Sequence, residues 1–162
     1  MEDVVVSGIA FDRKQAKVSM VDVPDRPGVA AEIFGALAQV SVNVDMIIQS
    51  AGQDGMNDIS FTVSEGDLQK AMDCLEPVKT KLRARAVQSE GGVAKVAVVG
   101  VGMRSHPGVA AKMFKALADA RINIQMISTS EIKISCIVSR DQMDQAVKVL
   151  HKAFELEKGK NK

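Results

Sequence analysis

The chain is poor in aromatic residues and in cysteine, and these scarcities exclude several classes of protein. Its 162 residues include no Trp, no Tyr, five Phe and two Cys. Proteins that read single-stranded RNA stack bases on exposed aromatic side chains, so the composition argues against a nucleic-acid partner. Cys74 and Cys136 stand alone and form no CxxC pair, which argues against an iron–sulfur cluster or a metallochaperone site. We expect two reduced core thiols.

Long apolar runs and an excess of charge are also missing. No segment approaches the ~18 apolar residues of a membrane span, and the start, Met1-Glu2-Asp3, lacks the pattern of a signal peptide. The formal net charge is +1, with both signs interspersed, which indicates no acidic or nucleic-acid partner. With 46% hydrophobic and 25% charged residues, the composition is typical of a soluble globular protein. We therefore expect a cytoplasmic protein with no membrane partner.

One stretch of the sequence is present twice. Pro27-Gly28-Val29-Ala30-Ala31 recurs 80 positions later as Pro107-Gly108-Val109-Ala110-Ala111, and 12 of the 21 residues from 27 to 47 recur unchanged. A repeat of this length indicates two copies of one supersecondary unit. A chain of 162 residues has room for two small domains of about 70–80 residues each.

The first copy predicts the element order β-α-β-β-α-β. Alternating or β-branched runs predict strands over residues 16–23, 42–49, 59–63 and 82–87. Apolar residues at helical spacing predict one helix from Pro27 through Ala38, and a second that Ser64 caps and that ends near Pro77. Strict alternation in the first of these strands places two sets of residues on opposite faces: Val18, Met20 and Asp22 against Ser19, Val21 and Val23.

The second copy repeats this order but ends without a fourth strand. It contains a strand from Ala94, a helix from Pro107, a strand over 122–127 and a final helix that Ser139 caps. A short strand over residues 4–10, which a polar turn at 12–15 ends, belongs to neither copy of the repeat. Gly91-Gly92 is predicted to be the linker between the two copies. We expect this N-terminal strand to complete the second sheet, because an unpaired sheet edge exposes backbone N–H and C=O groups that can pair with other chains.

The predicted fold class is therefore α+β, with two ferredoxin-like βαββαβ units, antiparallel sheets and helices on one face, the first unit nested within the second. The predicted boundaries are residues 15–90 for the first domain, residues 91–156 with the N-terminal strand 3–11 for the second, and a disordered tail at 157–162.

Five segments resemble the ACT domains of aspartate kinases: Val23–Ala31, Asn43–Ile47, Asp58–Thr62, Gly102–Ala111 and Ile124–Ser135. The resemblance covers nearly the whole chain, and its most selective part is the run Ser-Thr-Ser-Glu-Ile-Lys-Ile-Ser at 128–135. ACT domains are small-molecule sensors, usually for amino acids, and the tandem pair resembles the regulatory region of aspartate kinase (aspartokinase).

The resemblance implies feedback inhibition of aspartate kinase, the ATP-dependent first step of the aspartate-family pathway, by threonine, lysine or both. It implies a homodimer formed by ACT–ACT pairing, and a catalytic aspartate kinase subunit or domain as partner. The chain would be a separately made β subunit or an excised C-terminal piece, with no catalytic residues, metal or cofactor, and no kinase activity alone. The alternative is a free-standing tandem ACT sensor that controls a different enzyme or a transcription factor.

Elementary chemistry explains how such a unit holds an amino acid. A helix N-terminus at Gly28 offers unpaired N–H groups to a carboxylate, while Asp25 and Asp45 suit an ammonium and Gln49 adds a neutral hydrogen bond. Carried over residue by residue, the resemblance nominates nine effector-binding residues: Asp25, Gly28, Ala30, Asp45 and Gln49 in the first unit, and Asn123, Ile124, Thr129 and Ser130 in the second.

The two copies differ at the acidic positions. Asp25 aligns with Ser105 and Asp45 with Gln125, so we expect the second site to be weaker or only structural. Each acid also has a plain structural interpretation. Asp25 suits a helix N-terminus for its charge alone, Asp45 suits a solvated strand position, and Pro-Gly is common turn chemistry.

Overall fold

The computed structural model describes residues 5–101 and 106–156. The chain forms two compact units, Lys14–Gly92 and Met1–Arg13 with Val93–Lys162. The secondary structure confirms the α+β class, with antiparallel strands and four α-helices among the described residues. The predicted tail at 157–162, residues 3 and 4 of the predicted N-terminal strand, and Ser105 all lie outside the described ranges.

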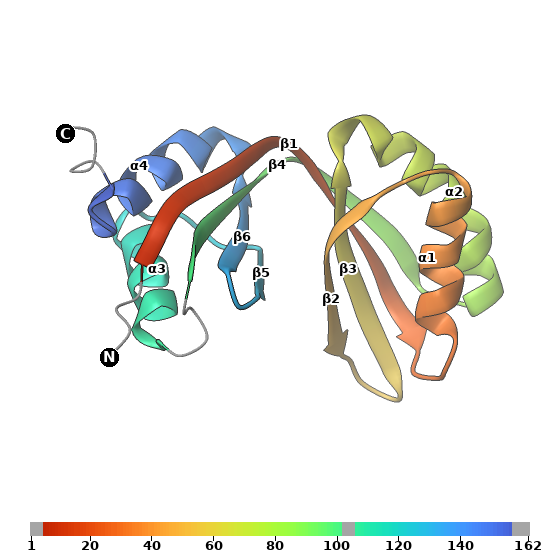
Figure 1. Ribbon diagram of the computed structural model, residues 1–162. Helices are drawn as coiled ribbons and strands as arrows, with labels where there is room; N and C mark the ends of the chain where they lie inside the picture. Colours follow the sequence, from red (N-terminus) through yellow and green to blue (C-terminus); the bar gives the residue numbers. More distant parts are fainter. Residues whose placement is uncertain (1–4, 102–105, 157–162) are drawn as a thin grey trace. The chain divides into compact units, whose positions relative to one another are not determined.

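The unit of residues 14–92 has the predicted order β-α-β-β-α-β. Its elements are the second half of β1 (Val5–Pro24), α1 (Val29–Gln39), β2 (Val44–Ala51), β3 (Met56–Ser64), α2 (Leu68–Leu82) and the start of β4 (Ala86–Val101). The strand order is β2-β3-β1-β4, and both β1 and β2 run antiparallel to β3. Figure 1 shows α1 and α2 together on one face of these strands.

The core of this unit lies between that sheet face and the two helices. Val18 and Phe61 of the sheet and Ile33 and Leu37 of α1 are fully buried. The ring of Phe34 meets that of Phe61 edge to face, with 5.4 Å between ring centroids. With so few aromatic residues, aliphatic side chains provide most of the burial that stabilises the fold.

The second unit repeats this arrangement with one strand borrowed from the chain start. It contains the first half of β1, the second half of β4, α3 (Gly108–Asp119), β5 (Met126–Thr129), β6 (Lys133–Ser139) and α4 (Met143–Ala153). Its strand order is β1-β4-β6-β5. Ser7 Oγ donates a hydrogen bond to the Val99 carbonyl oxygen at 3.2 Å, which joins the N-terminal strand to β4.

Two predicted breaks in regular structure and one predicted strand start are wrong. The predicted turn at 12–15 lies within the continuous strand β1, because this polar segment contains no Gly or Pro to end a strand. The predicted linker Gly91-Gly92 lies within β4, where Gly92 has φ 67°. Leu82 ends α2 instead of beginning a strand, since Arg83 adopts φ 55° and closes the helix.

The predicted faces of β1 are wrong beyond Met20. The pairing of β1 with β3 passes from Met20 opposite Ile59 to Val23 opposite Asn57, so three residues of β1 span two of β3. This β-bulge, in which Asp22 has φ 55°, returns Val23 to the core face.

The helix starts also differ from the prediction. Ser64 and Ser139 precede short 3₁₀ turns, Glu65–Asp67 and Arg140–Gln142, and neither serine side chain makes a capping hydrogen bond. The helices α2 and α4 begin only after these turns.

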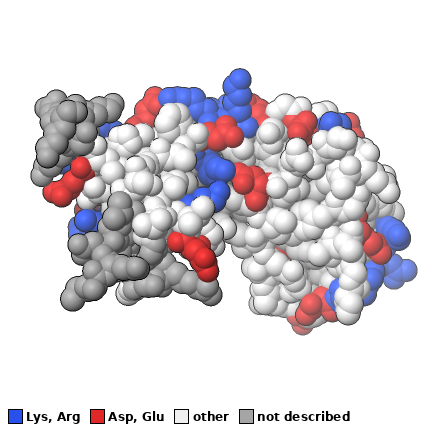
Figure 2. Space-filling model, viewed as in Figure 1, with Lys and Arg blue, Asp and Glu red and all other residues white. Residues whose placement is uncertain are grey.

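Two surface properties complete the description. None of the helices within 5–101 and 106–156 has the length and apolar character that crossing a bilayer requires. On the face in Figure 2, basic and acidic side chains are interspersed and form no extended patch of one sign.

Candidate functional site

A cavity of about 220 Å³ lies beside the β1–α1 loop in the unit of residues 14–92. It brings together four of the five residues nominated in the first copy: Asp25, Gly28, Ala30 and Gln49. The rest of the lining is Val23, Pro24, Arg26, Pro27, Val29, Asn57 and Ile59.

One wall of this cavity is the start of α1. Gly28 is the N-cap residue with φ 93° and ψ −12°, and its carbonyl oxygen accepts the first helical hydrogen bond from the Glu32 N–H at 3.0 Å. The left-handed φ explains why glycine occupies this position. The Asp25 N–H donates to the Gly55 carbonyl oxygen at 3.0 Å, which ties the loop to the β2–β3 hairpin. The first N–H groups of α1 thus lie at the cavity with the positive end of the helix dipole.

The floor of the cavity comes from β2 and β3. Gln49 lies directly opposite Ile59, and Asn57 lies two residues further along β3. Residues opposite one another in an antiparallel pair share a face, so all three side chains lie on the helix side of the sheet. Asn57 is only 7% exposed, and none of the side-chain hydrogen bonds among the described residues involves it.

Asn57 was missed by the sequence reasoning, although a signal was present. The strand was predicted from Ile59, and extending its alternation back by two residues places Asn57 on the buried face beside Ile59 and Phe61. A polar residue in such a buried row is unusual, and here it lines the cavity.

Asp45, the fifth nominated residue, does not line this cavity. The pairing of β2 with β3 shifts between Val44 and Ile47, where a bulge interrupts the alternation that would align Asp45 with Gln49. Asp45 is exposed on β2. Its neighbour Met46 donates its backbone N–H to Thr62 Oγ1 at 3.0 Å.

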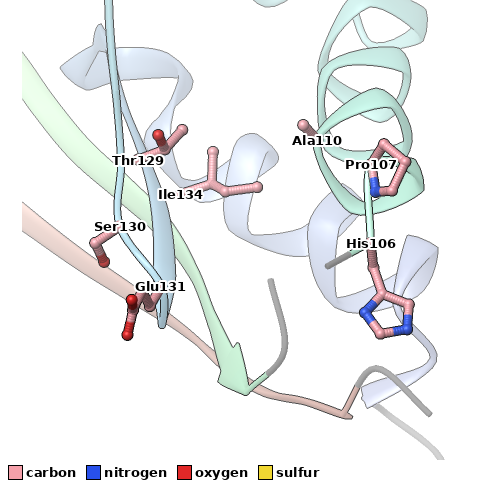
Figure 3. Close-up of a pocket in the computed structure, with 7 residues that line it drawn as sticks. All are labelled: His106, Pro107, Ala110, Thr129, Ser130, Glu131 and Ile134. Carbon is pink, nitrogen blue, oxygen red and sulfur yellow. The ribbon is translucent and has the colours of Figure 1, made fainter. Parts of the chain in front are cut away.

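A second cavity, of about 580 Å³, occupies the corresponding place in the other unit. Its lining is His106, Pro107, Ala110, Thr129, Ser130, Glu131 and Ile134. Figure 3 shows Thr129, Ser130 and Glu131 on one side, the residues at the start of α3 on the other, and Ile134 between them. The repeat relates four lining residues of the first cavity to four of the second: Pro27 to Pro107, Ala30 to Ala110, Gln49 to Thr129, and Ile59 to Ile134.

Two of the four residues nominated in the second copy line this cavity, Thr129 and Ser130. Asn123 and Ile124 precede β5 and do not line the cavity. Asn123 is exposed, and Ile124 packs against the core of its unit. The turn after β5 is closed by the Ser130 N–H, which donates to the Lys133 carbonyl oxygen at 2.8 Å.

This turn also brings Glu131 to the second cavity, which therefore does contain an acid. The sequence comparison of the two copies missed it because the second hairpin is five residues shorter, so Glu131 has no aligned counterpart in the first copy. His106, at the start of α3, also lines the cavity.

Both cavities combine the groups that an amino acid requires. A helix N-terminus offers N–H donors to a carboxylate, and carboxylate, amide or hydroxyl side chains across the cavity suit an ammonium or a polar side chain. Within the described residues, no group of three or more His, Cys, Asp or Glu side chains is placed to hold a metal ion.

Comparison with known proteins agrees with this arrangement. The family model for the ACT domain matches residues 18–77 and 96–154, one copy in each half of the repeat. The chain is therefore a tandem ACT domain protein.

Its relatives define the family more closely. The chain is 40% identical to the regulatory subunit of aspartate kinase from Thermus thermophilus in its ligand-free form, with a TM-score of 0.87, covering 92% of this chain and 98% of that one. A structure of aspartokinase α and β subunits is 49% identical, with a TM-score of 0.86 and coverage of 93% and 99%. The chain belongs to the aspartate kinase regulatory family.

Full-length relatives are much longer. The Helicobacter pylori aspartokinase is 49% identical over 157 residues, which are 97% of this chain and 38% of that protein. The chain thus spans 38% of the length of this relative and matches its regulatory region.

Proposed function

We propose that this chain senses threonine, lysine or both in its two cavities and thereby inhibits an aspartate kinase. The observation that carries the proposal is that one cavity is built twice, each time with a helix N-terminus facing polar side chains of the sheet or of its hairpin turn. A cavity with this chemistry that recurs in both copies supports ligand binding over turn formation alone.

The two cavities suit different effectors. The first is small, and Asn57 places an unpaired amide on its floor, which favours a compact amino acid with a hydrogen-bonding side chain, such as threonine. The second is larger, and the Glu131 carboxylate suits a cationic side chain such as that of lysine. A more distant relative, Escherichia coli aspartokinase III, 25% identical with a TM-score of 0.68, has been crystallised with lysine and aspartate in a form named the T-state.

Homodimerisation is part of the proposal, because the first cavity alone does not use all nominated residues. The strands β2 and β5 are the sheet edges and carry exposed, repeat-related isoleucines, Ile47 at 51% and Ile127 at 41%. Edge strands with exposed apolar residues favour pairing with another chain. Asp45 lies on one of these edge strands, where it would contact an effector held by a partner copy.

The inhibited enzyme would be a catalytic aspartate kinase subunit or domain. An effector that binds one arrangement of the regulatory units more tightly shifts the population toward it, and the attached catalytic part responds. Because the chain matches only the regulatory region of its relatives, we propose that it has no kinase activity alone. Co-purification with a kinase subunit, or its absence, tests this partner directly.

Effector binding is tested by thermal unfolding of the chain with each proteinogenic amino acid at millimolar concentration. At 100 times Kd, a ligand that binds only the folded state stabilises it by about 2.7 kcal/mol. We expect threonine or lysine to raise Tm selectively. Replacing Asp25 by Ala should lower the affinity for threonine at least about 10-fold, since hydrogen bonds to charged groups contribute ~1.5–3 kcal/mol. The exposed control Asp73→Ala should behave as wild type, and a panel without any selective shift would refute the proposal.

Asn57 provides the sharper test of the first cavity. In Asn57→Leu, the affinity for threonine should fall about 10-fold to 100-fold. The affinity for valine, which has the same shape without the hydroxyl, should fall little or rise. Isothermal titration with both amino acids measures this. An equal loss of both ligands would show that Asn57 only shapes the cavity.

A further inference from the structure

A third cavity, of about 440 Å³, lies in the unit of residues 14–92 and shares no lining residue with the first. It is formed where the end of β1, the β2–β3 hairpin and the α2–β4 connection meet, elements that Figure 1 shows within one unit. Its lining is Asp22, Gln53, Asp54, Met56, Arg83 and Arg85. The guanidinium groups of Arg83 and Arg85 at one cavity are the feature that requires an explanation.

A chain of hydrogen bonds fixes Arg85 at this cavity. The Arg85 backbone N–H donates to the Val21 carbonyl oxygen at 2.9 Å, and its side-chain Nε donates to Asp22 Oδ2 at 2.6 Å. The Asp22 backbone N–H in turn donates to Asp58 Oδ1 at 2.9 Å. The contact through Nε orients the guanidinium and leaves its two terminal nitrogens outside this ion pair.

Asp22 occupies an unusual backbone position to make these contacts. It has φ 55° inside β1, a conformation that L residues other than glycine adopt only at a cost. Aspartate is among the non-glycine residues that tolerate this conformation, and its side chain here also accepts the hydrogen bond from Arg85 Nε.

The remaining charges leave an excess of hydrogen-bond donors. The Arg83 side chain makes no ion pair or hydrogen bond with any residue in the described ranges. Asp54 lies in the hairpin turn, where Asp54 and Gly55 have φ 56° and 72°, the signature of a tight Asp-Gly turn, and its carboxylate is an acceptor at the cavity. Asp22 is matched by Arg85. What remains for a ligand is the Arg83 guanidinium together with the free end of Arg85.

We propose that this cavity binds a small molecule through an anionic group, a carboxylate or a phosphate. Arginine is suited to this role because its planar guanidinium donates paired hydrogen bonds to two oxygens of one group. The cavity volume falls within the range of about 300–1,000 Å³ that is usual for small-molecule sites. Gln53 and Asp54, across the cavity, would accept hydrogen bonds from a hydroxyl or amino group on the same molecule. This site is separate from the two amino-acid cavities and stands whether or not they bind an effector.

The test is a titration of the ¹⁵N-labelled full chain with two probes, inorganic phosphate and succinate, followed by the Nε–Hε resonances of arginine. Arg83→Gln and Arg85→Gln remove one guanidinium each. Arg121→Gln is the matched control, because Arg121 is an exposed arginine with φ 58° two residues after the end of α3, and Arg83 has φ 55° directly after the end of α2. Thermal unfolding of each variant verifies that it is folded.

We expect at least one probe to shift the Arg83 and Arg85 resonances saturably. Affinity should fall at least about 10-fold in Arg83→Gln and Arg85→Gln and stay within about twofold in Arg121→Gln. Binding of phosphate alone or of succinate alone identifies the anionic group. The absence of saturable shifts with both probes, or equal affinity in Arg83→Gln and Arg121→Gln, overturns the proposal. If Arg85→Gln unfolds, Arg83→Gln still decides, because the Arg83 side chain makes no ion pair or hydrogen bond with the described residues.

Discussion

The duplicated segment Pro-Gly-Val-Ala-Ala should respond in opposite ways to the same substitution in its two copies. Gly28 is the N-cap of α1 with φ 93°, whereas Gly108 is the first residue of α3 and has no left-handed φ. A methyl group added at either position would meet no other atom within 4 Å, apart from immediate chain neighbours. Steric clash therefore plays no part, and backbone conformation alone determines the effect of Gly→Ala.

The magnitudes follow from the two conformations. An L residue in the left-handed region costs roughly 1–2 kcal/mol, so Gly28→Ala should lower the free energy of unfolding by that amount. At a helical position Gly→Ala restricts the unfolded chain and gains about 0.4–1 kcal/mol, so Gly108→Ala should be stabilising. For a chain of this size 1 kcal/mol corresponds to about 2–4 °C in Tm.

Urea denaturation of wild type and both variants, with calorimetry for Tm, measures the difference. We expect the two variants to differ by roughly 1.4–3 kcal/mol with wild type between them. Equal effects of the same sign would refute the conformational distinction between the two loops. Threonine affinity should also fall in Gly28→Ala, since the strained loop forms one wall of the first cavity.

Three further predictions concern packing, thiol chemistry and surface charge. Phe61→Ala should lower the free energy of unfolding by about 3–5 kcal/mol in urea, because Phe61 is fully buried; a loss below ~1 kcal/mol would contradict its place in the core. Burial raises the pKa of Cys136 to about 12, so this thiol should resist Ellman's reagent in the folded protein at pH 8. Partial burial raises the pKa of Cys74 as well, and since the thiolate is the nucleophile, its slow reaction should accelerate as pH rises; two fast thiols at pH 8 would be inconsistent with this. Arg13→Ala breaks only an exposed ion pair with Asp144 and should change stability by less than about 1 kcal/mol in thermal unfolding.

Sequence reasoning located most of the first cavity because its signals are local. Pro27-Gly28 marks a strand-to-helix junction, and the helix that follows shows its buried stripe at Val29, Ile33 and Leu37. A loop before a helix fixes where N–H donors lie without reference to the rest of the chain. Asp25 and Ala30 flank this junction in the chain, so their nomination required no knowledge of long-range pairing.

Residues contributed from across the sheet were harder to identify. Asn57 reaches the first cavity only through the register of β3 against β1 and β2, and Glu131 reaches the second only through a shortened hairpin. Asp45 was nominated as an acid and by the resemblance, and a bulge in β2 separates it from the cavity that Gln49 lines. Bulges and register depend on hydrogen bonds between distant segments, which a single-strand pattern does not contain.

The sequence by itself determined that the protein is a duplication of a βαββαβ unit, because a segment that recurs 80 positions later and the hydrophobic periodicity are properties of the chain alone. Only the tertiary structure decided that β1 and β4 run unbroken through the predicted turn and linker. The physical reason is that a polar or glycine-containing segment extends as a strand when neighbouring strands satisfy its backbone hydrogen bonds, and those neighbours are distant in sequence.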